Sequence, residues 1–155
     1  MLDIDGYLSL SDLNTAKKLT VNKRFRTKTI IGTPEYMAPE IVTGKGYTFT
    51  VDLWSLGIFL YEFLCSKVPF GEGNDDPFLI YDEIKRGRLE FPLQFPKSTK
   101  LLIVKLLDLN PQKRIGTGFE ELKKHPFFTK IDFKSILDMT TKSPIKPEKS
   151  NEITP

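Results

Sequence analysis

The sequence predicts a mainly α-helical (α+β) fold that begins with a short β-hairpin, and three observations lead to this class. Residues 51–64 are apolar on almost every face, which is typical of a helix inside a helical core. Pro77 follows Asp76, a good helix N-cap, and starts an apolar stripe at helical spacing. Near the N-terminus, Asp5 and Gly6 between short apolar runs indicate a tight turn joining two strand ends.

Two further helices are predicted before the sequence becomes polar. Ser98 or Thr99 can cap one of them, and residues 119–124 form another that ends at His125 and Pro126. After about residue 136 the chain is rich in Pro, Lys and Ser. Residues 136–155 are therefore predicted to be a flexible tail behind a folded region of residues 1–135.

Composition and charge exclude several classes of function. The chain of 155 residues is long enough for one domain with a core. Its 23 basic and 20 acidic residues give a net charge of +3, too balanced to indicate nucleic acid or a membrane surface as a partner. Cys65 is the only cysteine, so no internal disulfide can form and we expect a reducing, cytoplasmic compartment. No signal peptide and no membrane span are expected from the hydropathy pattern.

Three motifs follow one another along the chain. Residues 32–40 read Gly-Thr-Pro-Glu-Tyr-Met-Ala-Pro-Glu, residues 51–57 read Val-Asp-Leu-Trp-Ser-Leu-Gly, and residues 110–116 read Asn-Pro-Gln-Lys-Arg-Ile-Gly. In this order and at these separations they resemble the C-terminal lobe (C-lobe) of a eukaryotic protein kinase. The resemblance covers residues 2–147. It implies that residues 1–135 are a partial kinase domain, a helical C-lobe with the activation segment but without the N-terminal lobe.

Shorter matches narrow the resemblance to the AGC group of serine/threonine kinases, and within it to the cAMP- and cGMP-dependent protein kinases. These matches are residues 45–47, 68–70, 88–92, 125–128 and 132–133. Residues 144–147, Pro-Ile-Lys-Pro, are similar to the P-x-x-P element of that group's C-terminal tail. Simple linker composition is the alternative for this last match.

The segment around Asp12 resembles the x-D-F-G-x-A-K segment that carries a metal-binding aspartate in kinases. The resemblance implies that Asp12 is a catalytic residue and a ligand of Mg²⁺, a hard cation that prefers carboxylate oxygen. Leu13 replaces the usual phenylalanine and Asn14 replaces the glycine. Asparagine tolerates the left-handed conformation better than most residues, so both departures are compatible with the role. The alternative is that Asp12 is a surface turn residue.

An activation loop is implied for residues 23–33, which end in the Gly-Thr-Pro-Glu motif. Thr29 matches the regulatory phosphothreonine of this loop. A phosphate there would add strong acceptors and negative charge, which nearby basic residues can hold. Those residues are Lys23, Arg24, Arg26 and Lys28. A solvated basic loop with an unmodified threonine is the alternative.

The residues that follow match the peptide-binding part of a kinase. Thr33 matches the threonine that contacts the catalytic base in serine/threonine kinases, so the resemblance gives it a catalytic role. Ile30, Pro34 and Met37 match the pocket for the substrate residue after the phosphorylated one, and their apolar side chains imply a hydrophobic residue there. Packing in the protein's own core is the alternative for these three.

Four further polar residues match structural or recognition positions. Glu40 and Arg114 match a buried ion pair that we interpret as structural. Asp52 matches the aspartate that braces the catalytic loop, and a helix N-cap is a compatible alternative. Glu62 lies in the apolar run, where a carboxylate is costly unless it is paired. The resemblance supplies a basic substrate residue as its partner, and one of the chain's own basic residues is the alternative.

The resemblance implies transfer of the γ-phosphate of ATP to Ser or Thr of protein substrates with nearby basic residues, with ATP and Mg²⁺ as cofactors. A regulatory subunit or a cyclic-nucleotide-binding domain is a further implied partner. These 155 residues contain no glycine-rich phosphate loop, strand lysine or H-R-D catalytic loop of the kinase type. We therefore expect the isolated chain, with half a site, to be inactive. A non-catalytic, pseudokinase-like binding or scaffold module is the alternative.

Overall fold

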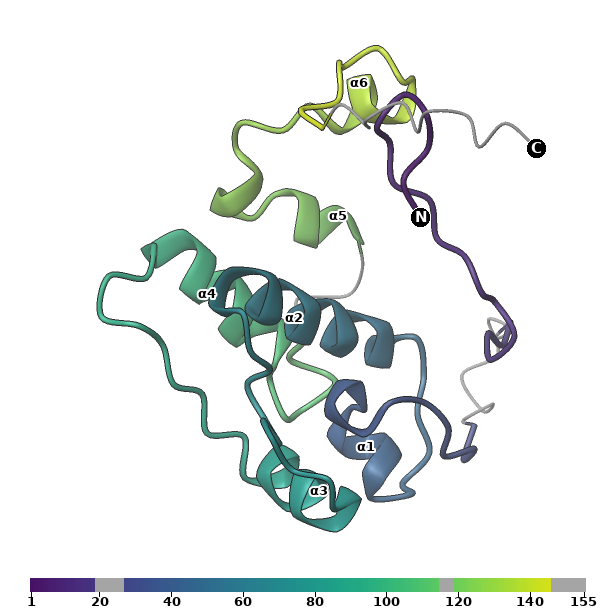
Figure 1. Cartoon of the computed structure of the whole chain (residues 1–155), viewed down its shortest axis with the longest axis vertical. Helices are drawn as coiled ribbons and strands as arrows, with labels where there is room; N and C mark the ends of the chain where they lie inside the picture. The colour runs from purple at the N-terminus through teal and green to yellow at the C-terminus, as the bar shows by residue number, and fades with distance from the viewer. Residues whose placement is uncertain (19–26, 115–118, 146–155) are drawn as a thin grey trace, which may run out of the picture. The chain divides into compact units, whose positions relative to one another are not determined.

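The computed structural model describes residues 1–18, 27–114 and 119–145, and it is mainly helical, as the sequence predicts (Figure 1). Its elements are η1 (Pro34–Tyr36), α1 (Pro39–Val42), α2 (Thr50–Cys65), α3 (Pro77–Arg86), α4 (Lys97–Leu106), α5 (Phe119–Lys123), η2 (Pro126–Phe128) and α6 (Phe133–Leu137). The described residues contain no β-strand. The chain divides into two compact units, Lys17–Thr129 and Met1–Ala16 with Lys130–Pro155.

Helix α2 organises the larger unit. One side of it is buried and consists of Leu53, Trp54, Gly57, Ile58 and Tyr61. Gly57 permits the close approach of α4, because a Cβ atom at this position would lie 2.8 Å from the Cβ of Leu106. The helix ends at Ser66, which adopts a left-handed conformation with φ of 56°.

The opposite side of α2 faces outward, so the prediction of a helix surrounded by core is wrong for half of its surface. Phe59 is 54% exposed and Phe63 is 76% exposed, and their rings stack on each other. The elements that pack against α2, mainly α4 and η1, cover the other side. Apolar residues on every face thus do not by themselves bury a helix, since each face also needs a neighbour.

The buried residues form two clusters around α2. In the first, Trp54 stacks on Phe70 with 5.7 Å between ring centroids. Ile80 and Ile84 of α3 and Ile103 of α4 belong to the same cluster. The second cluster joins α2 and α4 to α5 through Leu53, Leu102, Leu106 and Leu122. The clusters fix the surface on which η1 and α1 lie.

The helix starts test the capping predictions. Asp76 caps α3 as predicted, because its Oδ1 accepts a hydrogen bond of 2.9 Å from the backbone N–H of Phe78. The cap predicted for α4 is wrong, because Pro96 occupies the N-cap position. Ser98 and Thr99 therefore lie inside the first turn of α4, and Thr99 is buried there.

In the smaller unit the predicted hairpin is present only as a turn with one antiparallel bridge, between Leu2 and Leu8. The turn lies at the predicted place, since the backbone N–H of Gly6 donates to the carbonyl of Asp3 over 3.1 Å. Gly6 has φ of 85°, a conformation that favours glycine. With no third strand beside it, the bridge does not extend into a ladder.

His125 gives the larger unit a dependence on pH. Its Nδ1 accepts a hydrogen bond of 3.3 Å from the backbone N–H of Phe127, so the ring must be neutral. Burial and the nearby charge of Lys105 both lower the pKa of His125. An unfolded histidine has a pKa of about 6.5, so this stability is fully present above that pH and is lost as pH falls through the lower folded pKa.

We expect the urea midpoint of the chain to fall between pH 7.5 and about pH 5, and part of that fall to be due to His125. His125→Asn is the matched control, because an asparagine oxygen can accept the same backbone N–H without titrating. Its midpoint should fall less over this range. An equal fall in both proteins would contradict the role of His125.

Candidate functional site

The candidate activation segment is tied to the loop before α2. Thr27 and Tyr47 form an antiparallel bridge with N–H···O distances of 3.3 and 3.0 Å. The hydroxyl of Tyr47 also donates to the carbonyl of Thr29 over 2.8 Å. The backbone on both sides of Lys28 is thereby held while the Thr29 side chain stays exposed.

Thr29 lies at the end of a short chain of polar groups. Lys17 Nζ donates to Thr27 Oγ1 over 3.2 Å, and this oxygen lies 3.4 Å from Thr29 Oγ1. The side chain of Thr27 is buried in this arrangement. Residue-type reasoning did not identify Lys17 or Thr27, although Lys17 completes the motif around Asp12.

Of the four basic residues predicted to hold a phosphate on Thr29, only Lys28 lies in the described part of the chain. Lys23, Arg24 and Arg26 lie outside the described residues. Lys28 is exposed. In the described part of the chain, Lys17 is connected to the Thr29 hydroxyl through Thr27.

The short helix η1 presents the predicted peptide-binding residues. Thr33 is exposed at its N-cap, and Pro34 is half-buried at its first position. Ile30 is 56% exposed, whereas Met37 is only 6% exposed and belongs to the core. Core packing therefore describes Met37, and Ile30 and Pro34 remain accessible to a ligand.

Two contacts join η1 to α2. Ser55 Oγ donates to the carbonyl of Tyr36 over 3.0 Å. The Tyr36 hydroxyl donates to Glu62 Oε2, and this hydrogen bond, together with burial and the charges of Glu62 and Glu35, raises the pKa of Tyr36 to about 12. The phenol is therefore neutral and donates to the carboxylate throughout the physiological range.

Glu62 has no basic partner among the described residues, so the alternative of an ion pair within that part of the chain is wrong. Its hydrogen-bond partner is the uncharged Tyr36. Oε2 of Glu35 is also buried without a hydrogen-bond partner. The negative charges of Glu62 and Glu35 thus both affect the Tyr36 hydroxyl. This arrangement favours binding of a cation from a ligand.

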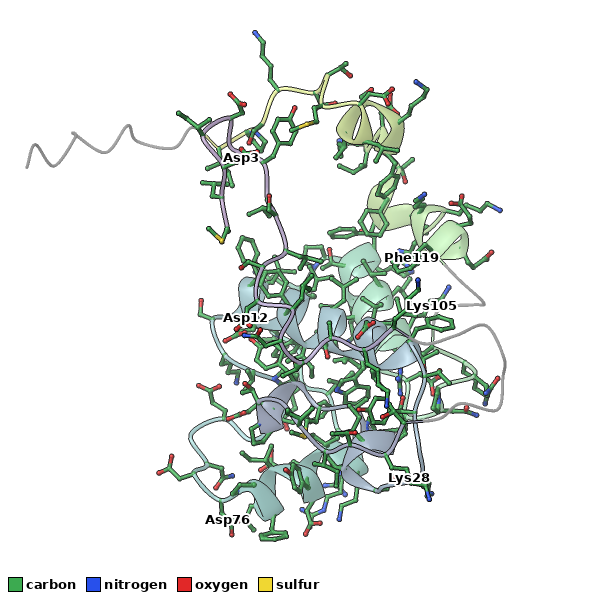
Figure 2. The ribbon with its side chains drawn as sticks, turned by 90° about the vertical axis from the view of Figure 1, so that its right-hand side faces the viewer. Asp3, Asp12, Lys28, Asp76, Lys105 and Phe119 are labelled. Carbon is green, nitrogen blue, oxygen red and sulfur yellow. The ribbon has the colours of Figure 1, made fainter. Side chains whose placement is uncertain are left out.

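Asp12 lies in the smaller unit, on the extended stretch that follows the hairpin (Figure 2). Its side chain is exposed, and its φ of 59° is left-handed. Asn14 does not adopt the left-handed conformation that its residue type tolerates. No group of three or more Asp, Glu, His or Cys side chains able to hold a metal ion occurs in the described part of the chain. Asp12 therefore offers one carboxylate to a cation.

Glu40 and Arg114 form a buried bidentate pair in the larger unit. Arg114 Nη1 and Nη2 donate to the two carboxylate oxygens of Glu40 over 2.7 and 3.0 Å. The guanidinium is fully buried, donates to the carbonyls of Thr50 and Asp108, and lies 5.2 Å from the ring centroid of Trp54. This pair connects α1 to the start of α2.

Asp52 does not cap α2, because Phe49 occupies the N-cap position and Asp52 lies within the first turn. The N-cap interpretation is therefore wrong. Desolvation raises the pKa of the Asp52 carboxyl above its usual range. A carboxylate in the first turn is still favoured by the helix dipole.

A family model described as a protein kinase domain matches residues 1–128. The chain is 38% identical over 152 residues to the cGMP-dependent protein kinase of Eimeria tenella, covering 96% of this chain and 15% of that protein. It is 40% identical over 154 residues to the serine/threonine-protein kinase gad8 of Schizosaccharomyces pombe, covering 99% and 26%. It is 39% identical over 155 residues to the cAMP-dependent protein kinase catalytic subunit PRKX of Mus musculus, covering 98% and 42%.

The chain thus spans less than half of the length of each of these relatives. All three relatives are named as protein kinases, which agrees with the motifs at residues 32–40 and 51–57. Among the described helices, none is long and apolar enough to cross a membrane.

Proposed function

Because the chain belongs to the protein kinase family, we propose that it forms the substrate-binding part of an AGC-type serine/threonine kinase. The complete protein transfers the γ-phosphate of ATP to Ser or Thr of protein substrates with nearby basic residues. Residues 1–135 are the partial kinase domain and residues 136–155 the tail. The names of the relatives support a cyclic-nucleotide-binding domain or regulatory subunit as a partner. The cytoplasm, expected from the single cysteine, is the proposed location.

The observation that carries this proposal is the acidic arrangement at Tyr36. Glu62 is half-buried, accepts a hydrogen bond from Tyr36, and has no cation beside it in the described residues. A substrate arginine would supply that cation and bind the carboxylate in a bidentate way. The accessible Ile30 and Pro34 would receive the residue after the phosphorylated one.

The catalytic roles follow from chemistry at two positions. Asp12 would hold Mg²⁺, which neutralises the phosphates of ATP when both are bound. A single exposed carboxylate fits one ligand position of such a hard cation. Thr33, exposed at the start of η1, would contact the catalytic base and orient the peptide-binding segment.

Thr29 is the regulatory phosphorylation site in this proposal. A phosphate on its exposed hydroxyl would add about −1.5 to −2 charge near the ammonium group of Lys17, which already donates to Thr27. The new charge-assisted hydrogen bonds would strengthen the attachment of the activation segment.

The test uses the chain and a fluorescent peptide with two arginines before a serine. Glu62→Gln should weaken binding, measured by fluorescence anisotropy, by about tenfold or more, because a charge-assisted hydrogen bond is lost. Glu121→Gln, an exposed change on α5, is the matched control and should leave the affinity unchanged. With Mg²⁺ and labelled ATP the chain should transfer no more phosphate than Asp12→Ala. Equal affinities for Glu62→Gln and the unchanged chain would contradict substrate recognition by Glu62.

A further inference from the structure

In the smaller unit, the tail residues 141–145 lie against the N-terminal hairpin, where Figure 1 shows the yellow and purple segments side by side. Ser143 Oγ donates to the carbonyl of Gly6 over 2.7 Å and accepts from the backbone N–H of Ile145 over 3.1 Å. The Tyr7 hydroxyl donates to the carbonyl of Thr141. The contact thus joins residues more than 130 positions apart in the sequence.

The geometry at Gly6 shows how closely the two segments meet. A Cβ atom at this position would lie 2.1 Å from the carbonyl oxygen of Ile145 and 2.7 Å from Ser143 Oγ. Gly6 also has φ of 85°, which strains any other residue. The tail therefore fits here only because position 6 carries no side chain.

The contact depends on the hydroxyl proton of Ser143. The carbonyl of Gly6 is an acceptor, so the proton on Ser143 Oγ must be directed at it. Ser143 precedes Pro144, and the residues on either side of Ser143 are exposed while Ser143 itself is half-buried. The hydroxyl therefore becomes accessible when this part of the tail moves away from the hairpin.

We propose that Ser143 is a phosphorylation site at which a proline-directed protein kinase releases the tail from the hairpin. In that reaction Ser143 Oγ forms a bond to the terminal phosphorus of ATP. The bond from that phosphorus to ADP breaks, and the hydroxyl proton passes to the base of the modifying kinase. ATP and the modifying kinase are the only co-reactants.

Phosphorylation would replace the hydrogen-bond donor of this contact with acceptor oxygens. A phosphoserine side chain carries about −1.5 to −2 charge and only acceptor oxygens when fully ionised, so it cannot donate to the Gly6 carbonyl. Ser143 and Asp5 line the same groove of about 570 Å³, so the phosphate would also meet a carboxylate. Lys142 lines this groove too and would offset part of the repulsion. The lost donor and the close fit at Gly6 favour release.

Release would act on the segment that leads to Asp12. The hairpin bridge at Leu8 is followed directly by the stretch that carries Asp12. Freeing the hairpin from the tail would therefore loosen the attachment of this stretch. This consequence for catalysis rests on the proposed role of Asp12, whereas the release itself does not.

The experiment treats the chain with a purified proline-directed kinase and ATP. Peptide mapping by mass spectrometry should find one phosphoryl group on Ser143. Hydrogen exchange should then become about tenfold faster in peptides covering residues 1–10 and 138–145, because a hydrogen bond is lost and a repulsion added. Exchange in α2 should stay unchanged and shows that the larger unit remains folded. Absence of phosphate at Ser143, or unchanged exchange after its addition, would overturn the proposal.

Three variants separate the hydroxyl from other effects. Ser143→Ala should block modification and speed exchange in the hairpin moderately, whereas Ser143→Thr should retain both the donor and the modification. Thr141→Ala is the matched control, because the contact with Tyr7 uses the backbone carbonyl of residue 141. Faster exchange in Thr141→Ala equal to that in Ser143→Ala would overturn the assignment to Ser143. None of these readouts depends on Glu62 or Asp12, so they remain decisive if the proposed peptide binding fails.

Discussion

Arg114→Ala is expected to lower the unfolding free energy by about 3–5 kcal/mol, because it leaves a buried carboxylate without its partner. Glu40 is only 7% exposed and receives both of its charge-assisted hydrogen bonds from this guanidinium. The change also removes the donors to the carbonyls of Thr50 and Asp108 and the cation beside Trp54. The loss should appear as a lower midpoint in urea unfolding followed by tryptophan fluorescence.

Lys85→Ala is the control for this experiment. Lys85 forms an ion pair of 2.5 Å with Asp82 in the same unit, but both side chains are about half exposed. Exposed pairs of this kind contribute about 0.2–1 kcal/mol, so its midpoint should hardly move. The double variant Glu40→Met with Arg114→Met should be more stable than Arg114→Ala, since no unpaired charge stays buried. An Arg114→Ala loss below about 1 kcal/mol would contradict the structural interpretation of the pair.

How far the sequence predicts this molecule depends on whether the interaction is local. Asp76 was identified from residue type and spacing alone, because an N-cap bonds a backbone N–H two residues away. Glu40 and Arg114 are separated by 74 positions, and no local pattern relates them. That pairing came from the resemblance to kinases, and the structure places the two side chains together.

The predictions that failed did so because residue type alone does not decide between competing neighbours. Ser98 and Thr99 are good caps by residue type, but α4 begins at Lys97 with Pro96 at the N-cap position. The partner of Glu62 within the described residues, the hydroxyl of Tyr36, was not predicted. An uncharged partner cannot be found by matching charges. Lys17 was missed for a related reason, since its contact with Thr27 depends on tertiary packing.

The second large expected effect is a difference in stability between substitutions on the two faces of α2. Two adjacent residues, one on each face, can test it. Ile58 is 0% exposed in the main core cluster, and Phe59, the next residue, is 54% exposed. Ile58→Ala should cost about 2–5 kcal/mol, because it removes buried methyl groups and leaves a cavity. Phe59→Ala removes more carbon atoms but should change the unfolding free energy by no more than about 0.5–1 kcal/mol, as surface substitutions do.

Urea unfolding of both variants at several protein concentrations measures this difference directly. Both residues have similarly modest helix propensities, so alanine stabilises the helix by a comparable amount in the two variants. The difference between their unfolding free energies therefore reports the difference in burial. A large loss for Ile58→Ala with a small one for Phe59→Ala supports the one-sided packing of α2 on α4 and η1. If Phe59→Ala costs as much as Ile58→Ala, the outer face is covered in solution. A loss for Phe59→Ala that grows with protein concentration would identify a second copy of the chain as the cover.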